Sequence, residues 1–259
     1  LNGPDPAASG VSVPSPTSPE VALQSNGSGI TEPKNDENVP ATAVSEVKPA
    51  VVLNLNAIQH SEATDSHALL CLDFGTAMSK AFASLPPSEY IELALGREAG
   101  GEGYAVPSSV FIGEDGKAYF GFEAIEHSAD LVEVGRGRLD SIKSWLSVSQ
   151  GQNLDGESSK LPPELNPTNV KLTRGDLIRI YMAYLTDLSC NILSHYSIDR
   201  YVKRRYARPC WPTQEQVAWA DKQMRAMLVE SQILADTFSG QWRGGIDVAL
   251  LKDAIEQIK

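Results

Sequence analysis

Apolar residues are spaced differently in the two halves of the chain that follows Ser66. In the first half they form short runs, or alternate with polar residues, between clusters of Gly, Pro and Ser, which predicts β-strands. Segments of this kind are 68–72, 78–84, 90–95, 106–112 and 117–120. The last two flank Glu114-Asp115-Gly116, a turn sequence that predicts a β-hairpin.

In the second half the apolar residues recur at helical spacing. Short helices are predicted at 121–128 and 135–146, ahead of a polar loop over 150–168. A strand is expected over 200–208, and a second long helix after Thr213. The whole pattern is typical of a mixed α/β protein, with strands concentrated before the helices.

A longer helix is predicted between these elements. Thr173 and Asp176 have the spacing of a capping box, so the helix should begin at Arg174 and continue to about Tyr196. Its Leu, Tyr and Ile residues recur three and four positions apart, which indicates a face buried in the core.

The first 66 residues have a different composition, rich in Pro, Ser, Asn, Ala and Gly. Eight of the sixteen prolines fall at or before Pro49, and no aromatic residue precedes Phe74. Such a segment cannot bury enough apolar surface to offset the entropy cost of ordering the chain. We expect 1–66 to be a disordered leader, serving as a tail or linker or binding a partner, and the folded part to span 67–259.

Charge and cysteine usage exclude several classes of protein. The leader accounts for −6 of the formal net charge of −11, so the remainder is only mildly acidic. The basic cluster Lys203-Arg204-Arg205 lies in an alternating strand pattern, which gives no support to nucleic-acid binding. No stretch approaches the roughly 18 apolar residues that span a membrane. The cysteines Cys71, Cys190 and Cys210 lie far apart, which favours free thiols in a reducing, cytoplasmic compartment.

Candidate chemistry is concentrated where the first strand ends, at Asp73-Phe74-Gly75-Thr76. Gly75 can adopt a positive φ and lets the backbone approach a ligand, while Thr76 and the turn amides can donate to phosphate oxygens. Asp73 can hold hydrated Mg²⁺, which takes one or two carboxylates. The pattern predicts half of a nucleotide-phosphate site, although a plain hairpin turn uses the same residue types.

Four segments in a fixed order extend this hypothesis: CLDFGTAMS at 71–79, VPSSVFI at 106–112, DSIKSWL at 140–146 and RYARPCWPTQEQVAWADKQMRAM at 205–227. They resemble the first phosphate loop, the Pro-Ser strand, the catalytic-lysine segment and the interdomain relay of the heat-shock protein 70 (DnaK-like) chaperones. The resemblance covers about 69–238. It implies the N-terminal part of an actin-like ATPase domain, from a divergent bacterial branch.

By this resemblance, the fold is a ribonuclease H-like first lobe with an inserted α+β subdomain over about 85–172. Asp73 would bind Mg²⁺ through water and take part in catalysis. The β and γ phosphates of ATP or ADP would be held by Gly75, Thr76 and Ala77.

The resemblance assigns three further residues. Lys143 would position the water that attacks the γ-phosphate, and Pro209, with Arg208, would relay the nucleotide state to a substrate domain. Clients and co-chaperones are the partner proteins that the family implies. Judged without the family, Lys143 is a solvated lysine on a polar helix face and Pro209 is a strand terminator.

The chain departs from the family pattern in two ways. Ala77 stands where the chaperones usually have a second hydroxyl residue, so hydrolysis is expected to be slow. No second D-x-G loop and no Gly-Gly adenosine motif follow Pro209. We therefore expect a fragment that ends before the second lobe, supplies one wall of the pocket and is inactive alone.

Two alternatives use the same residues. One is another member of the actin-like superfamily, such as a sugar kinase or a filament protein, which would share the D-x-G-T loop. The other is a nucleotide sensor or scaffold without turnover, which the missing hydroxyl at Ala77 favours. Lys143 and Pro209 favour the chaperone-like ATPase over the sugar kinase.

Overall fold

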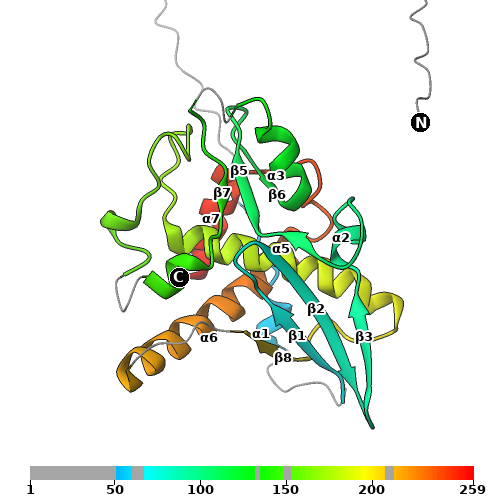
Figure 1. Cartoon of the computed structure of the whole chain (residues 1–259). Helices are drawn as coiled ribbons and strands as arrows, with labels where there is room; N and C mark the ends of the chain where they lie inside the picture. Colours follow the sequence, from blue (N-terminus) through cyan, green and yellow to red (C-terminus); the bar gives the residue numbers. More distant parts are fainter. Residues whose placement is uncertain (1–50, 60–66, 132–134, 149–152, 208–212) are drawn as a thin grey trace, which may run out of the picture. The chain divides into compact units, whose positions relative to one another are not determined.

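Two β-sheets and several helices form a mixed α/β fold (Figure 1). The computed structural model describes residues 51–59, 67–131, 135–148, 153–207 and 213–259. In chain order the elements are α1 (Asn56–Gln59), β1 (Leu69–Asp73), β2 (Met78–Leu85), β3 (Glu89–Leu93), α2 (Leu95–Glu98), β4 (Val106–Pro107), β5 (Ser109–Ile112), β6 (Lys117–Phe120), α3 (Gly121–Ser128), β7 (Leu139–Asp140), α4 (Ser144–Val148), the 3₁₀ turn η2 (Glu157–Ser159), α5 (Arg174–His195), β8 (Lys203–Tyr206), α6 (Gln214–Thr237), β9 (Ile246–Asp247) and α7 (Val248–Ile258).

The first sheet has the strand order β3-β2-β1-β8, and β4 pairs with the start of β2. β1, β2 and β3 form an antiparallel meander, in which Asp73 lies opposite Lys80. β8 lies parallel to β1, with Leu69 opposite Lys203. Parallel neighbours need a crossover connection, and the segment from β1 to β8 includes α5.

The strands of this sheet bury one face. Along β2, Ser79, Ala81 and Ala83 are buried, whereas Lys80 and Phe82 are exposed. The predicted alternation over 78–84 is therefore confirmed.

The second sheet has the order β7-β5-β6-β9. β5 and β6 form the hairpin predicted around Glu114-Asp115-Gly116, with Phe111 opposite Tyr119. Its edge strand β9 pairs with β6, and Lys117 lies opposite Asp247. The second sheet therefore combines residues from the expected insert with a strand near the end of the chain.

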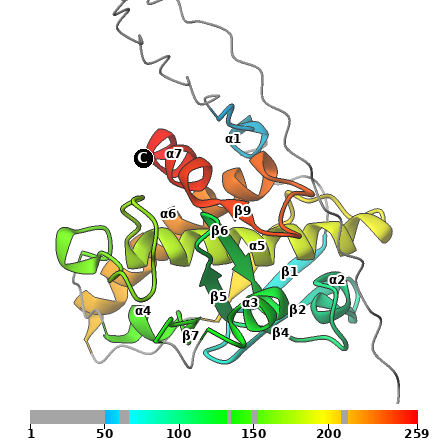
Figure 2. The same cartoon turned by 90° about the horizontal axis from the view of Figure 1, so that it is seen from above.

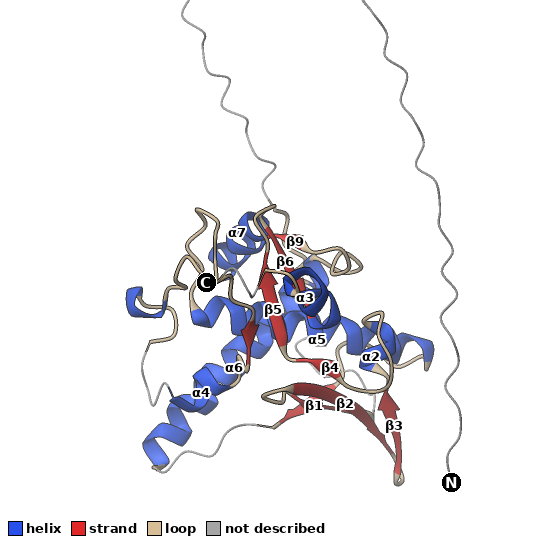
Figure 3. Ribbon diagram, turned by 45° about the horizontal axis from the view of Figure 1, so that its top comes forward, coloured by secondary structure: helices blue, strands red, loops and turns tan. Residues whose placement is uncertain are grey.

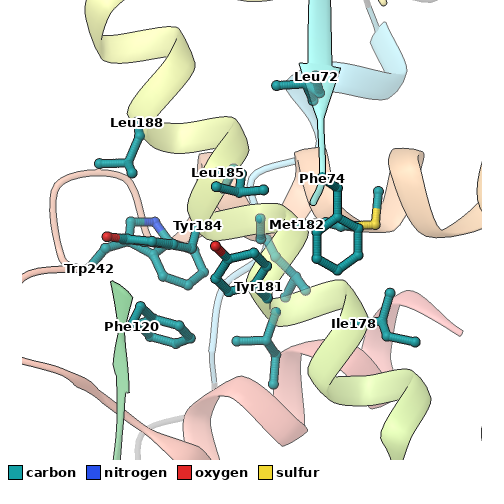
Figure 4. Close-up of a cluster of buried hydrophobic side chains, with 14 of the residues drawn as sticks. Leu72, Phe74, Phe120, Ile178, Tyr181, Met182, Tyr184, Leu185, Leu188 and Trp242 are labelled. Carbon is teal, nitrogen blue, oxygen red and sulfur yellow. The ribbon is translucent and has the colours of Figure 1, made fainter. Parts of the chain in front are cut away.

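α5 connects the two sheets in the core. Its capping box is formed as predicted, with the Thr173 hydroxyl accepting from the Asp176 amide and the Asp176 carboxylate accepting from the Thr173 amide. Most of its 22 residues are buried. Tyr181 and Tyr184 face an aromatic cluster that includes Phe120 (Figure 4). α6 packs beside α5 (Figure 2).

Three predicted elements differ from the structure. The segment 135–146 is not one helix, because Leu139 and Asp140 pair with β5 as strand β7 and Ser141 adopts a positive φ of 60° before α4 begins. The segment 106–112 divides into two strands, since β4 pairs with β2 and β5 pairs with β6. The third strand ends at Leu93, and α2 follows it. Pairing between distant segments decides these elements, which local spacing does not reveal.

Residues 51–59 lie within the segment expected to be the leader, yet they contact the folded part. The Val51 amide donates to Oδ2 of Asp253 over 3.2 Å, and the Asn54 amide donates to Oγ1 of Thr237 over 3.0 Å. Val51 and Leu53 pack against the core. These residues therefore belong to the same unit as the helices α6 and α7 that they contact.

Candidate functional site

The turn between β1 and β2 carries the residues of the predicted phosphate site. Asp73, the last residue of β1, is exposed and lies opposite Lys80 in the strand pairing. Phe74 is 3% exposed, and its ring centroid lies 5.5 Å from that of Tyr181 on α5. Phe74 therefore anchors the turn to the core, while Asp73 and Thr76 remain at the surface.

Gly75 has a steric role that differs from the predicted one. Its φ lies outside the left-handed region, so the turn does not use the positive φ that glycine permits. A Cβ at this position would lie 1.9 Å from the backbone oxygen of Met78. Because β1–β2 pairing fixes the backbone on both sides, a residue with a side chain does not fit without a shift of the turn. The close approach is thus between two parts of the turn itself.

Hydrogen bonds from the interior of the protein hold the β1–β2 turn in place. The Ser108 hydroxyl donates to the Gly75 carbonyl oxygen, and the Ser108 amide donates to the Ala77 carbonyl oxygen, each over 2.9 Å. The hydroxyl oxygens of Ser79 and Ser108 are 2.9 Å apart, and neither residue is exposed. Since a serine hydroxyl has one proton, Ser108 accepts from Ser79 while it donates to Gly75.

Tyr181 closes this network from α5. Its hydroxyl lies 2.8 Å from the Pro107 carbonyl oxygen, to which it donates, and 3.3 Å from Oγ of Ser79. Burial raises the pKa of Tyr181 far above its usual value, so the hydroxyl stays a neutral donor. Sequence reasoning placed Tyr181 only in the core stripe and missed Ser108. The signal for Ser108 was a small polar residue between a proline and an apolar strand.

On the other side of the turn, two amides have no partner among the residues that the structure describes. Those of Thr76 and Ala77 donate to no acceptor within the part of the chain that the structure describes, and both residues are exposed. The two free donors are consecutive and lie within a few residues of the Asp73 carboxylate. Such an arrangement offers hydrogen bonds to an oxyanion and a ligand to a hydrated cation.

Lys143 lies in the turn between β7 and α4 and is partly buried, so its predicted place on a helix was wrong. Ser109, the neighbour of Ser108, donates from its hydroxyl to Oδ1 of Asp140 over 2.5 Å. Burial would raise the pKa of Asp140, but hydrogen bonds from Arg138 and Ser109 hold it below its usual value. The strand β7, which precedes Lys143, therefore pairs with β5 (Figure 3). Ser108, the residue just before β5, holds the β1–β2 turn.

The remaining predicted residues are only partly placed. No contact joins Asp73 to Lys143 among the described residues. Pro209 and Arg208 lie outside the described ranges. In the described ranges, no group of three or more His, Cys, Asp or Glu residues could hold a metal ion. A lone carboxylate suits Mg²⁺ that keeps its waters and contacts phosphates, because Mg²⁺ needs few protein ligands in such sites.

A groove of about 750 Å³ opens on the exposed face of β2 and β3. Phe82, Tyr90 and Tyr104 line it, and they are 43%, 68% and 48% exposed. Lys80 also lines it, directly opposite Asp73 in the strand pairing. The groove therefore runs along β2 and β3, and none of the turn residues 74–77 lines it.

The chain matches no protein-family model, and no curated protein matches it either. Among the helices that the structure describes, none has the length and apolar character needed to cross a membrane.

Proposed function

We propose that the chain carries the first lobe of a chaperone-like, actin-type protein that binds and hydrolyses ATP with Mg²⁺ and couples hydrolysis to conformational change. The β1–β2 turn is the observation that carries this proposal. There the exposed Asp73 carboxylate is three residues before Thr76, whose amide, like that of Ala77, has no partner among the described residues. Buried contacts from Ser108 fix the turn before any ligand binds.

The strand order supports a ribonuclease H-like lobe. An antiparallel meander, β1 to β3, is followed by a long helix and then by β8, parallel to β1. This is the order of elements that the resemblance to the chaperone ATPase domain implies. The turn that would hold phosphate joins the first two strands of that meander.

The proposal gives each residue a role. Asp73 would hold Mg²⁺ through water, the turn amides would bind the β and γ phosphates, and Lys143 would orient the attacking water. Mg²⁺, when bound, neutralises phosphate charge. Phosphoryl transfer needs little covalent chemistry from the protein, because positioning and charge stabilisation dominate. Lysine suits this position, being a compact cation with three donors.

Coupling to the rest of the protein is assigned to Pro209, with Arg208, in the connection between β8 and α6. The chain supplies one wall of the nucleotide pocket, because its sequence holds no second D-x-G loop. We therefore expect these 259 residues to bind nucleotide weakly and to lack turnover by themselves.

Binding is tested by NMR titration of the chain with ATP and ADP, each with and without Mg²⁺. The Thr76 and Ala77 amide resonances should shift, and Asp73→Asn should abolish the Mg²⁺-dependent part of the shift. Glu92→Gln, an exposed carboxylate on β3 of the same sheet, is the control and should behave as the wild type. Shifts confined to other residues would contradict the site assignment.

A nucleotide sensor or scaffold without turnover is the second candidate function, which the methyl side chain of Ala77 favours. ATP hydrolysis by the natural polypeptide that contains both lobes separates the two. Loss of turnover in both Asp73→Asn and Lys143→Ala, but not in the exposed Lys117→Ala, supports the ATPase. Binding without turnover identifies the sensor, and sugar-dependent turnover identifies a sugar kinase.

A further inference from the structure

The outer face of the first sheet carries exposed apolar side chains. α5 lies on the other, inner side of the sheet, where Tyr181 contacts Ser79 (Figure 3). On the outer face, Met78, Phe82 and Tyr90 are 41%, 43% and 68% exposed. Apolar side chains gathered on an open face mark an interaction surface. None of the three takes part in the proposed nucleotide site.

Strand pairing arranges the outer side chains in rows that cross the sheet from β3 to β8. One row consists of Glu92, Phe82, Cys71 and Arg205, and the next consists of Tyr90, Ser84, Leu69 and Lys203. Glu92 is exposed at the β3 edge, whereas Lys203 and Arg205 are exposed at the β8 edge. The face is therefore acidic along one edge, basic along the other and largely apolar between them.

The charges at the two edges are not paired with each other. Among the described residues, no ion pair or side-chain hydrogen bond involves Glu92, Lys203 or Arg205. Glu92 and Arg205 are three strand spacings apart, about 14 Å, which is too far for an ion pair. Burial raises the pKa of Cys71 and the positive charge of Arg205 opposes this rise, so the guanidinium lies near Cys71. Each edge can therefore take an opposite charge from another molecule.

The groove of about 750 Å³ lies on the acidic side of this face. Its lining combines three aromatic residues, two glutamates and one lysine: Phe82, Tyr90, Tyr104, Glu89, Glu92 and Lys80. Aromatic faces and carboxylates both attract guanidinium and ammonium groups. The guanidinium carbon of Arg97 already lies 5.8 Å from the centroid of the Tyr104 ring. The groove therefore suits a long basic side chain of a partner.

We propose that this face binds a second copy of the chain, about a two-fold axis that runs between β1 and β2 and parallel to them. The axis lays the β3 edge of each copy over the β8 edge of the other. Arg205 of one copy then enters the groove beside the partner's Glu92, and Phe82 packs over the partner's Cys71. An axis across the strands would place like charges together, so the charges select one arrangement.

The size of the face sets the strength of this contact. Sheets that pack face to face keep their strands nearly aligned, which the proposed axis satisfies. Four strands of about five residues cover roughly 19 by 16 Å, from spacings of about 4.8 Å between strands and about 3.3 Å per residue. A contact of this size is near the lower limit for specific interfaces. We therefore expect a weak, reversible dimer with a Kd on the order of 100 µM.

The test is sedimentation equilibrium of the chain at concentrations below and above that Kd. Phe82→Ala should raise the Kd at least about tenfold, because its ring lies at the centre of the interface. Ile125→Ala, on α3, removes a side chain of a residue that is 39% exposed and is the matched control. It should dimerise as the wild type does.

Exchange of charges tests the axis. Glu92→Arg and Arg205→Glu should each raise the Kd several-fold, because each places like charges together twice in one dimer. An equimolar mixture of the two variants should dimerise more tightly than either alone, since opposite charges then face each other. Glu92→Arg also makes the formal net charge of −11 less negative, so a general effect of charge would strengthen its dimer instead. Glu126→Arg, at an exposed residue of α3, makes the same change and is the control.

The proposal is overturned if the chain stays monomeric well above the expected Kd, since the face would then belong to a different partner or to solvent. A dimer that Phe82→Ala leaves unchanged would overturn it as well, because the contact would lie elsewhere. So would a mixture of Glu92→Arg and Arg205→Glu that dimerises no better than its two components.

Discussion

The hydroxyl of Ser108 lies 2.9 Å from the carbonyl oxygen of Gly75, although 33 residues separate the two in the sequence. Ser108 stands between β4 of the first sheet and β5 of the second. One buried side chain therefore fixes both the candidate phosphate turn and the passage of the chain between the sheets.

Ser108→Ala should destabilise the protein by about 1–3 kcal/mol, because it removes the donor to the partly buried Gly75 carbonyl and the acceptor of the buried Ser79 hydroxyl. Urea denaturation measures the change in the free energy of unfolding. Ser88→Ala, at an exposed serine whose hydroxyl donates to the carbonyl oxygen of its neighbour Pro87, is the control. Equal stability of the two variants would contradict the role of the network.

Gly75→Ala should cost about 1–3 kcal/mol or more, since the added methyl would lie 1.9 Å from the Met78 backbone oxygen and force the turn open. We also expect the free amides of the turn to lose their arrangement, which would weaken the proposed binding of nucleotide. Gly156→Ala is a matched control, because a Cβ there meets its nearest atoms only at 3.4 Å. Thermal unfolding of both variants checks the difference, and a Gly75→Ala protein as stable as the control would refute it.

The buried carboxylate of Asp176 should make stability depend on pH in acid. Lys252 and Lys259 each donate to it over 3.0 Å, as does the Thr173 amide. Burial alone would raise the pKa of Asp176, but these donors hold it below its usual value. A lowered pKa in the folded state means that Asp176 stabilises the fold above the unfolded-state pKa, near 3.9, and loses this effect as the pH falls through the folded-state value.

Asp176→Asn should therefore lower the free energy of unfolding by about 2–3 kcal/mol at neutral pH. This is less than the cost of breaking a wholly buried ion pair, because the side chains of both lysines are partly exposed. The difference from the wild type should shrink as the pH drops below about 4. Glu256→Gln, whose side chain is 65% exposed and 3.5 Å from Lys252, should change little at any pH. A pH-independent difference for Asp176→Asn would rule out the ionic contribution.

Cysteine alkylation should proceed in a fixed order. Burial raises the pKa of both Cys71 and Cys190, but Cys190 is only 4% exposed whereas Cys71 is partly accessible at the sheet. In a Cys210→Ser background, iodoacetamide should modify Cys71 first, and Cys190 should react only on unfolding. Mass spectrometry of timed samples measures the order, and simultaneous modification in the native state would contradict the burial of Cys190.

Elements whose signals are local could be predicted from the sequence. The helix cap at Thr173 and Asp176 and the alternation along β2 follow from residues a few positions apart. The strand at Leu139 and Asp140 could not be predicted, because it exists through its pairing with β5.

The candidate site also combines features that local sequence predicts with features that depend on distant segments. The positions of Asp73 and Thr76 at the end of the first strand follow from the apolar run before them. The support from Ser108 and Tyr181 does not, since it requires knowledge of which distant segments meet. The reason for Gly75 could not be decided from the sequence, because glycine serves either a positive φ or a close backbone approach and the sequence does not distinguish them.

The burial of α5 also determines how the protein unfolds. Tyr181 reaches the first sheet at Pro107, and Tyr184, one turn later, stacks on Phe120 of the second sheet at a centroid distance of 5.1 Å. Neither sheet can open without exposing this helix, so the amide hydrogens of α5 should exchange with solvent only when the entire unit unfolds. The two sheets then form a single cooperative unit, so any motion that leaves the fold intact must occur at the borders of this unit.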